Sequence, residues 1–143
     1  MGVEEILRKK GHDIYSVPQS AKLREAIGVL NAKNIGVVLI TDEAGKLVGI
    51  LSERDIIRRS LSQETGFRDE VVTKSMTKDV LTVAPSTSVD EVMEIMTKSH
   101  IRHIPVMDGD NIAGLISIGD VVKRKIADAE NEAAAMRDYI TAG

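Results

Sequence analysis

Cysteine and tryptophan are absent from this 143-residue sequence, and only Tyr15, Phe67 and Tyr139 are aromatic. Without cysteine there can be no disulfide framework, thiolate zinc site or cysteine nucleophile, and the composition is compatible with the reducing cytoplasm, where we expect the protein. Single-stranded nucleic acids are commonly bound by stacking their bases on aromatic side chains, so the scarcity of aromatics argues against that ligand. The core must therefore be built from Val, Ile, Leu, Met and Ala.

Strong charge and long apolar runs are also missing. The formal net charge of −3 gives no basic field of the kind that attracts nucleic acid. No stretch of about 18 apolar residues is present to cross a membrane. We therefore expect neither nucleic acid nor membrane as a partner.

The sequence also has none of the common catalytic signatures. It has no Gly-rich phosphate loop, no G-x-G-x-x-G, no metal triad and no nucleophile-elbow serine. We predict that the chain is not an enzyme and holds no metal or catalytic cofactor. His100 and His103 lack an evident third ligand and should lie in an extended segment, so they do not change this prediction.

The dominant feature is an internal repeat. Residues 14–59 match residues 80–125 at a shift of 66 positions and, after one deletion, 65. Apolar and turn positions superpose, as the following pairs show: Val17 with Val83, Leu30 with Met96, Gly49 with Gly114, Ser52 with Ser117 and Asp55 with Asp120. Such a pattern indicates a duplicated fold unit.

Each copy changes its periodicity in the same order. A short extended segment is followed by an amphipathic helix, then by two apolar strands separated by a turn, and then by a second helix. We predict an α+β fold made of two β-α-β-β-α repeats that pack as a pseudo-two-fold pair, with helices at both ends. The expected units are an N-terminal helix at 1–13, the first repeat at 14–61, a linker at 62–79, the second repeat at 80–126 and a C-terminal helical extension at 127–143.

Two details concern the segments outside the repeats. One short helix is expected in the linker around residues 71–76. The final helix should run about five turns, and its apolar stripe is expected to pack on the body or on a partner chain.

Both copies carry the same short motif, Gly49-Ile-Leu-Ser52-Glu-Arg-Asp55 and Gly114-Leu-Ile-Ser117-Ile-Gly-Asp120. Together with residues 101–106 (Ile-Arg-His-Ile-Pro-Val), these motifs resemble the CBS (cystathionine beta-synthase) domain family, and in particular small bacterial proteins made only of a CBS pair. The resemblance implies two clefts that bind AMP, ADP, ATP, NAD(H) or S-adenosylmethionine. It also implies a homodimer that regulates an associated protein.

The Ser-x-x-Asp patterns are helix caps by their spacing, and this alternative stays open for Ser52, Asp55, Ser117 and Asp120. A helix N-terminus also has free N–H donors that attract a phosphate, and the Ser hydroxyl adds a donor. The Asp one turn into the helix can accept hydrogen bonds from both ribose hydroxyls. We expect the four residues to bind ligand.

Cationic and apolar residues complete the expected site. Arg54 and Arg102 are candidates for the phosphate, because a guanidinium matches two phosphate oxygens. The alternative for both is surface solvation or a salt bridge, and it has more weight for Arg54. The resemblance implies that His103 lies beside the nucleotide. A slot for adenine, or alternatively plain core, is expected from Tyr15, Val17, Val37, Val38, Ile104 and Pro105.

The leading hypothesis is a regulatory module that senses an adenine nucleotide, with AMP first, and that modulates a separate protein. The first alternative is NAD(H) as the ligand. The second, of another class, is a structural dimerisation scaffold without a ligand. Because Glu53-Arg54 in one copy is matched by Ile118-Gly119 in the other, we expect the two clefts to differ in affinity or ligand.

Overall fold

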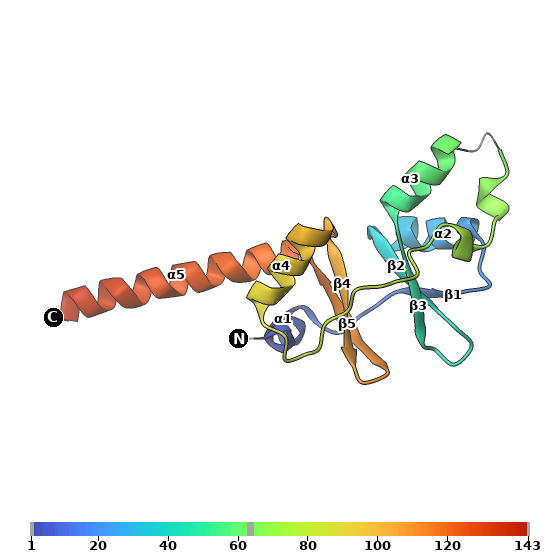
Figure 1. The fold of residues 1–143 in the computed structure, drawn as a ribbon. Coiled ribbons are helices and arrows are strands. Elements are labelled where there is room, and N and C mark those ends of the chain that lie inside the picture. The colour runs from blue at the N-terminus through green and yellow to red at the C-terminus, as the bar shows by residue number, and fades with distance from the viewer. Residues whose placement is uncertain (1, 63–64, 143) are drawn as a thin grey trace.

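The computed structural model describes residues 2–62 and 65–142 and consists of two halves of similar construction (Figure 1). Helix α1 (Val3–Lys10) precedes the first half. The first half contains β1 (Ser16–Pro18), α2 (Leu23–Lys33), β2 (Val37–Thr41), β3 (Leu47–Ser52) and α3 (Glu53–Ser62). The second half contains α4 (Val89–Ser99), β4 (His103–Asp108), β5 (Asn111–Ser117) and α5 (Ile118–Ala142).

The sheets confirm the expected α+β class. In the first half β1 runs parallel to β2, and β2 pairs antiparallel with β3. In the second half β4 pairs antiparallel with β5, while the counterpart of β1 is reduced to one parallel bridge between Val83 and Val106. Each half is thus a β-α-β-β-α unit, and the second unit has the shorter first strand.

Helices α2 and α4 end in the same way at equivalent positions. Asn34 and His100 both take the left-handed conformation, with φ of 52° and 53°. A left-handed residue at this point ends a helix and turns the chain, and Asn is one of the residues that tolerate it well. In both halves the chain then enters the strand that leads to the motif.

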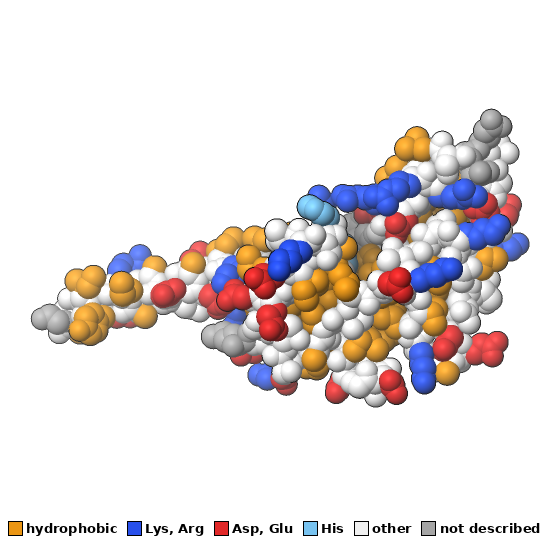
Figure 2. Space-filling view, viewed as in Figure 1, with side chains coloured by type: hydrophobic (Ala, Val, Ile, Leu, Met, Phe, Trp, Pro, Cys, Tyr) orange, Lys and Arg blue, Asp and Glu red, His pale blue; other side chains and the backbone are white. Residues whose placement is uncertain are grey.

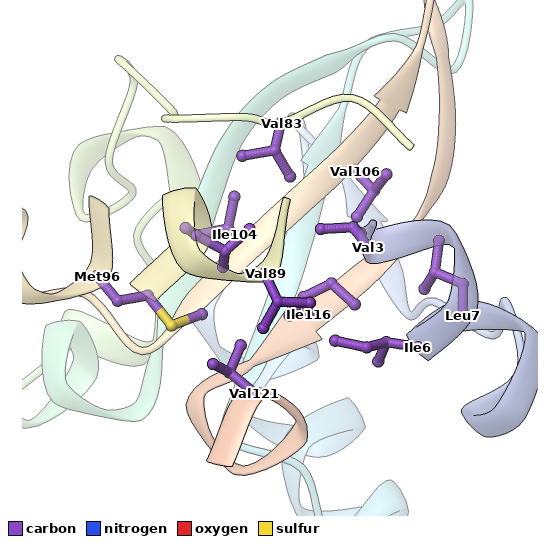
Figure 3. Close-up of a cluster of buried hydrophobic side chains, with 11 residues drawn as sticks. Val3, Ile6, Leu7, Val83, Val89, Met96, Ile104, Val106, Ile116 and Val121 are labelled. Atoms are coloured by element: carbon purple, nitrogen blue, oxygen red, sulfur yellow. The ribbon is translucent and has the colours of Figure 1, made fainter. Parts of the chain in front are cut away.

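The segment that precedes each half packs on the other half. Val3, Ile6 and Leu7 of α1 are buried in the core of the second half, and Figure 3 shows them facing Ile116 and Val106. The linker has two short turns of 3-10 helix, η1 (Phe67–Asp69) and η2 (Val72–Lys74), in place of one helix around residues 71–76. Val72 of η2 is buried in the core of the first half. This exchange ties the two halves together.

The motif glycines are required by this exchange. A Cβ placed on Gly114 would lie 2.6 Å from Cδ2 of Leu7, and one on Gly49 would collide with the Met76 side chain. Leu7 and Met76 therefore hold equivalent places over the two sheets. A larger residue at either glycine would push the exchanged segment off the sheet.

Helix α5 has 25 residues, or about seven turns, which is longer than the five expected. Its beginning packs on the body through the buried Val121. Arg124 and Lys125 still form ion pairs with Glu5 and Asp90. The rest of the helix extends away from both halves (Figure 1), and Met136 and Ile140 are 62% and 73% exposed. Within residues 2–62 and 65–142, no helix is long and apolar enough to span a bilayer.

Candidate functional site

Two cavities are lined by residues of both halves. The larger, of about 870 Å³, is lined by Ser52, Asp55 and α3 on one side and by residues 99–103 on the other, and we call it the first cleft. The smaller, of about 350 Å³, is lined by Lys10, Tyr15 and Ser117, and we call it the second cleft. Figure 2 shows a recess between the halves with Lys and Arg side chains along one edge and a histidine at the other.

Ser52 and Asp55 form a reciprocal cap at the start of α3. The Asp55 N–H donates to Oγ of Ser52 at 3.2 Å, while Oδ2 of Asp55 accepts from the Ser52 N–H at 2.9 Å and from its hydroxyl at 3.0 Å. The capping alternative is therefore realised. Oδ1 of Asp55 has no hydrogen-bond partner among the described residues, and Asp55 lines the first cleft, so this oxygen remains able to accept from a ligand.

The second half repeats the cap with one difference. The Asp120 N–H donates to Oγ of Ser117 at 3.1 Å, and Oδ2 of Asp120 accepts from the Ser117 N–H at 2.9 Å. This same oxygen also accepts from Nζ of Lys10 at 2.6 Å. Partial burial acts to raise the pKa of Asp120, but the hydrogen bonds from Lys10 and Ser117 outweigh it and lower the pKa. Asp120 is thus held ionised and already paired.

Three arginines supply cationic groups to the first cleft. Arg54 and Arg58 of α3 and Arg102 before β4 all line it. None of the three forms an ion pair with another residue in the described part of the chain. The carboxylates of Glu53, Asp55 and Asp79 line the same cavity, so the site offers both donors for an anion and acceptors for hydroxyls.

Val37 and His103 line both cavities, so they form a wall that the two clefts share. Burial, aided by the positive charge of Lys10, lowers the pKa of His103. The imidazole is therefore neutral near pH 7 and can accept or donate a hydrogen bond on either side. A ligand in either cleft would lie against this wall.

The structure brings some of the expected site residues together and places others in the cores. Those in the first cleft are Val37, Ser52, Arg54, Asp55, Arg102 and His103; those in the second are Tyr15, Val37, His103 and Ser117. Asp120 lies behind Lys10 and does not line the second cleft. The remaining four are buried, namely Val17, Val38, Ile104 and Pro105, so the core alternative describes their position.

Several lining residues were missed by the sequence analysis. Val80 and Leu81 line the first cleft at the places that Ile14 and Tyr15 hold in the second, so the internal repeat could have indicated them. Each cleft therefore combines the entry segment of one half with the motif serine of the other. Lys10 precedes the repeat, and no sequence pattern pointed to it.

Metal ligands do not gather in the described structure. Over residues 2–62 and 65–142, no group of three or more His, Asp or Glu side chains is placed to hold an ion. What the first cleft offers is an arrangement for a ligand with an anionic group and hydroxyls.

The family model described as CBS domain matches twice, at residues 3–62 and 69–126. A mitochondrial CBS domain-containing protein of Arabidopsis thaliana is 32% identical over 123 residues, which cover 83% of this chain and 60% of that protein. The chain thus spans less than two thirds of the length of this relative.

Solved structures give the same result. A protein with CBS domains from Burkholderia ambifaria is 40% identical, with a TM-score of 0.83 over 90% of this chain and 96% of that one. The CBS domain pair of protein MJ0100, solved with 5′-methylthioadenosine and S-adenosylmethionine, is 28% identical with a TM-score of 0.78 over 90% of this chain and 98% of that one. A CBS domain protein of Pyrobaculum aerophilum, solved with AMP, is 26% identical with a TM-score of 0.75 over 84% and 89%.

Proposed function

Because the chain belongs to the CBS-domain family, we propose that it is a regulatory module, not an enzyme, that binds an adenine nucleotide of the AMP, ADP and ATP class. Its output is a change in the association or activity of a separate protein. A ligand can drive such a change only if it binds the two states of the module with different affinity.

The observation that carries the proposal is the composition of the first cleft. The ligands of the related solved structures share adenosine, whose ribose hydroxyls need an acceptor. Asp55 supplies an acceptor with one carboxyl oxygen unpaired in the described structure, in the lining of a cavity of about 870 Å³. Val37, Val80 and Leu81 add apolar surface on which a base can pack.

The charges of the first cleft favour a ligand with a phosphate. 5′-Methylthioadenosine has no anionic group, and S-adenosylmethionine has a carboxylate beside a sulfonium cation, so neither brings a phosphate to Arg54, Arg58 and Arg102, which form no ion pair in the described structure. A nucleotide phosphate is matched by the guanidinium fork and by the N-terminus of α3. AMP therefore fits the charges of the first cleft better than the sulfur-containing ligands.

NAD(H) is the second candidate, and the size of the first cleft favours it. At about 870 Å³ this cavity lies toward the upper end of the range for small-molecule sites. It has room for a ligand that extends beyond one nucleotide.

A thermal-shift panel tests the proposal and separates these ligands. The panel consists of AMP, ADP, ATP, NAD, NADH and S-adenosylmethionine. A ligand at about 100 times its Kd adds about 2.7 kcal/mol to the unfolding free energy, so AMP is expected to raise the melting temperature by several degrees. A larger rise with NAD or NADH would favour the second candidate. No rise with any of them, on protein freed of carried-over nucleotide, would contradict ligand sensing and favour the scaffold alternative.

A second copy of this chain is the partner we propose for the outer part of α5. Its apolar residues follow a spacing of three and four over two heptads, at Ile126, Ala129, Ala133, Met136 and Ile140. We call this stripe the α5 seam. Ile126, Met136 and Ile140 are more than half exposed, so the seam has nothing covering it within the described chain.

Charges beside the α5 seam support pairing with itself. Glu130 and Arg137 occupy the same heptad position one repeat apart, and neither forms an ion pair in the described structure. In an antiparallel pair of α5 helices, Glu130 of one copy lies opposite Arg137 of the other, and the two-fold axis generates this pair a second time. The seam therefore fits a two-fold homodimer.

The remaining expectations concern location and other partners. We propose the cytoplasm as the location, in keeping with the absence of cysteine. We do not propose nucleic acid as a partner, because a net charge of −3 does not attract its phosphates.

A further inference from the structure

We infer that Lys10 restricts the second cleft by standing between that cleft and the carboxylate of Asp120 that a ribose would need, so that the first cleft is the principal adenosine site. The inference rests on the proposed function. It assigns to Lys10 a role in deciding which cleft a nucleotide enters.

Lys10 is fixed at the second cleft by two contacts. Its Nζ donates to Oδ2 of Asp120 at 2.6 Å and to the carbonyl oxygen of Leu115 at 2.9 Å. Lys10 lines the second cleft, whereas Asp120 does not. The ammonium group therefore stands between the cavity and the carboxylate.

Among the residues that the structure describes, no cation is paired with the aspartate of the first cleft, Asp55. Leu7 and Met76 hold equivalent places over Gly114 and Gly49, and the residue three positions after Met76 is Asp79. Asp79 lines the first cleft and cannot pair with Asp55 as Lys10 does with Asp120. The asymmetry therefore arises from the exchanged segments, which lie outside the repeats.

The backbone explains how Lys10 comes to this place. In the first half, Ile50 of β3 exchanges two backbone hydrogen bonds with Thr77, at 3.0 and 2.9 Å. The equivalent residue on β5 is Leu115, whose carbonyl accepts from Lys10 instead, and Ala113 O is contacted by His12 Nδ1 at 2.9 Å. Thr77 in the linker pairs with β3 through its backbone, whereas α1 is helical and ends at Lys10. The side chains of Lys10 and His12 therefore make the corresponding contacts to β5.

Oδ1 of Asp120, like Oδ1 of Asp55, has no hydrogen-bond partner among the described residues. Because Lys10 lines the second cleft and Asp120 does not, a ribose would have to displace the Lys10 ammonium from Oδ2 to reach this carboxylate. The lowered pKa of Asp120 is consistent with a carboxylate that Lys10 stabilises in its ionised form. A hydrogen bond to a charged group contributes enough free energy that a ligand which must break one to bind loses about tenfold or more in affinity. The second cleft should therefore bind AMP at least about tenfold more weakly than the first.

Isothermal titration with AMP tests the inference in a background that isolates the second cleft. Asp55→Ala removes the proposed ribose acceptor of the first cleft. Adding Lys10→Met to it should tighten AMP binding at least about tenfold relative to Asp55→Ala alone. Lys9→Met in the same background is the matched control, because Lys9 is the neighbouring lysine on α1 and is exposed without a contact to Asp120.

Each other outcome contradicts the role of Lys10. Unchanged or weaker binding after Lys10→Met would mean that Lys10 does not compete, or that it binds the phosphate. Two equal AMP sites in the unmodified protein would show that the second cleft is not restricted. If neither the unmodified protein nor Lys10→Met binds AMP at all, the proposed function fails as well, whereas binding confined to the first cleft in both overturns only the inference.

Discussion

Asp55→Ala is expected to weaken AMP binding by at least about 100-fold. Two ribose hydroxyls lose their acceptor, and each hydrogen bond to a charged group contributes about 1.5–3 kcal/mol. Arg54, Arg58 and Arg102 remain to attract the phosphate, so a residual affinity should persist. Titration calorimetry with AMP measures the change directly.

The matched control for this prediction is Asp120→Ala. It removes the equivalent carboxylate, which is already paired with Lys10, and it should change AMP affinity by less than about threefold, or 0.7 kcal/mol. Asp55→Ala also removes the reciprocal cap of α3, at a cost of about 1 kcal/mol in stability, so a melting curve must show that the variant is folded. Equal losses from the two variants would mean that both clefts bind AMP alike. If both variants bind AMP with unchanged affinity, neither motif aspartate accepts hydrogen bonds from the ribose.

Met136→Asp is expected to convert the proposed homodimer into a monomer. In an antiparallel pairing Met136 lies opposite Ala133 of the other copy near the middle of the α5 seam. The dimer would then bury two carboxylates without partners, one from each copy. This costs several kcal/mol and should weaken association at least about 100-fold. Sedimentation velocity over a concentration series measures the result.

Ala135→Asp provides the control on the same turn of α5. Residue 135 is exposed and lies off the seam, so the added charge should leave the sedimentation coefficient unchanged. A monomeric unmodified protein would contradict the proposal, as would a dimer unaffected by Met136→Asp. Because the chain has no cysteine, single cysteines at 129 and 140 can report the helix direction by cross-linking. Antiparallel pairing predicts a cross-link between 129 and 140 of two copies.

Much of the fold could be predicted because it is written twice in the sequence. The repeat gave the order of strands and helices, and the period-two and period-3.6 patterns gave their types. The shared motif indicated Ser52, Asp55, Ser117 and Asp120, and the structure places all four at the starts of α3 and α5 with the expected caps.

The exchange of the entry segments was beyond sequence reasoning. Nothing in the spacing of Val3, Ile6 and Leu7 says which half they cover, because an apolar stripe fits any complementary sheet face. The exchange decides where Lys10 lies, so the difference between Asp55 and Asp120 could not be foreseen. The motif residues predicted only that the two clefts differ in affinity or ligand.

The adenine slot was difficult for a similar reason. Buried strand residues and ligand-contacting residues have the same apolar character, so Val17, Val38, Ile104 and Pro105 could not be separated from Val37 by type. Val37 stands at the start of β2, where the strand opens into both clefts. Val38 is one residue further in, and its side chain alternates to the core face.

The most direct test of the account is a two-dimensional amide NMR spectrum of the unmodified protein titrated with AMP. The account predicts the largest shifts at the backbone amides of residues 52–55 and at Arg102 and His103, which surround the first cleft, with smaller shifts at residues 117–120. No shifts at saturating AMP, or shifts confined to residues 117–120 or to the outer part of α5, would contradict it.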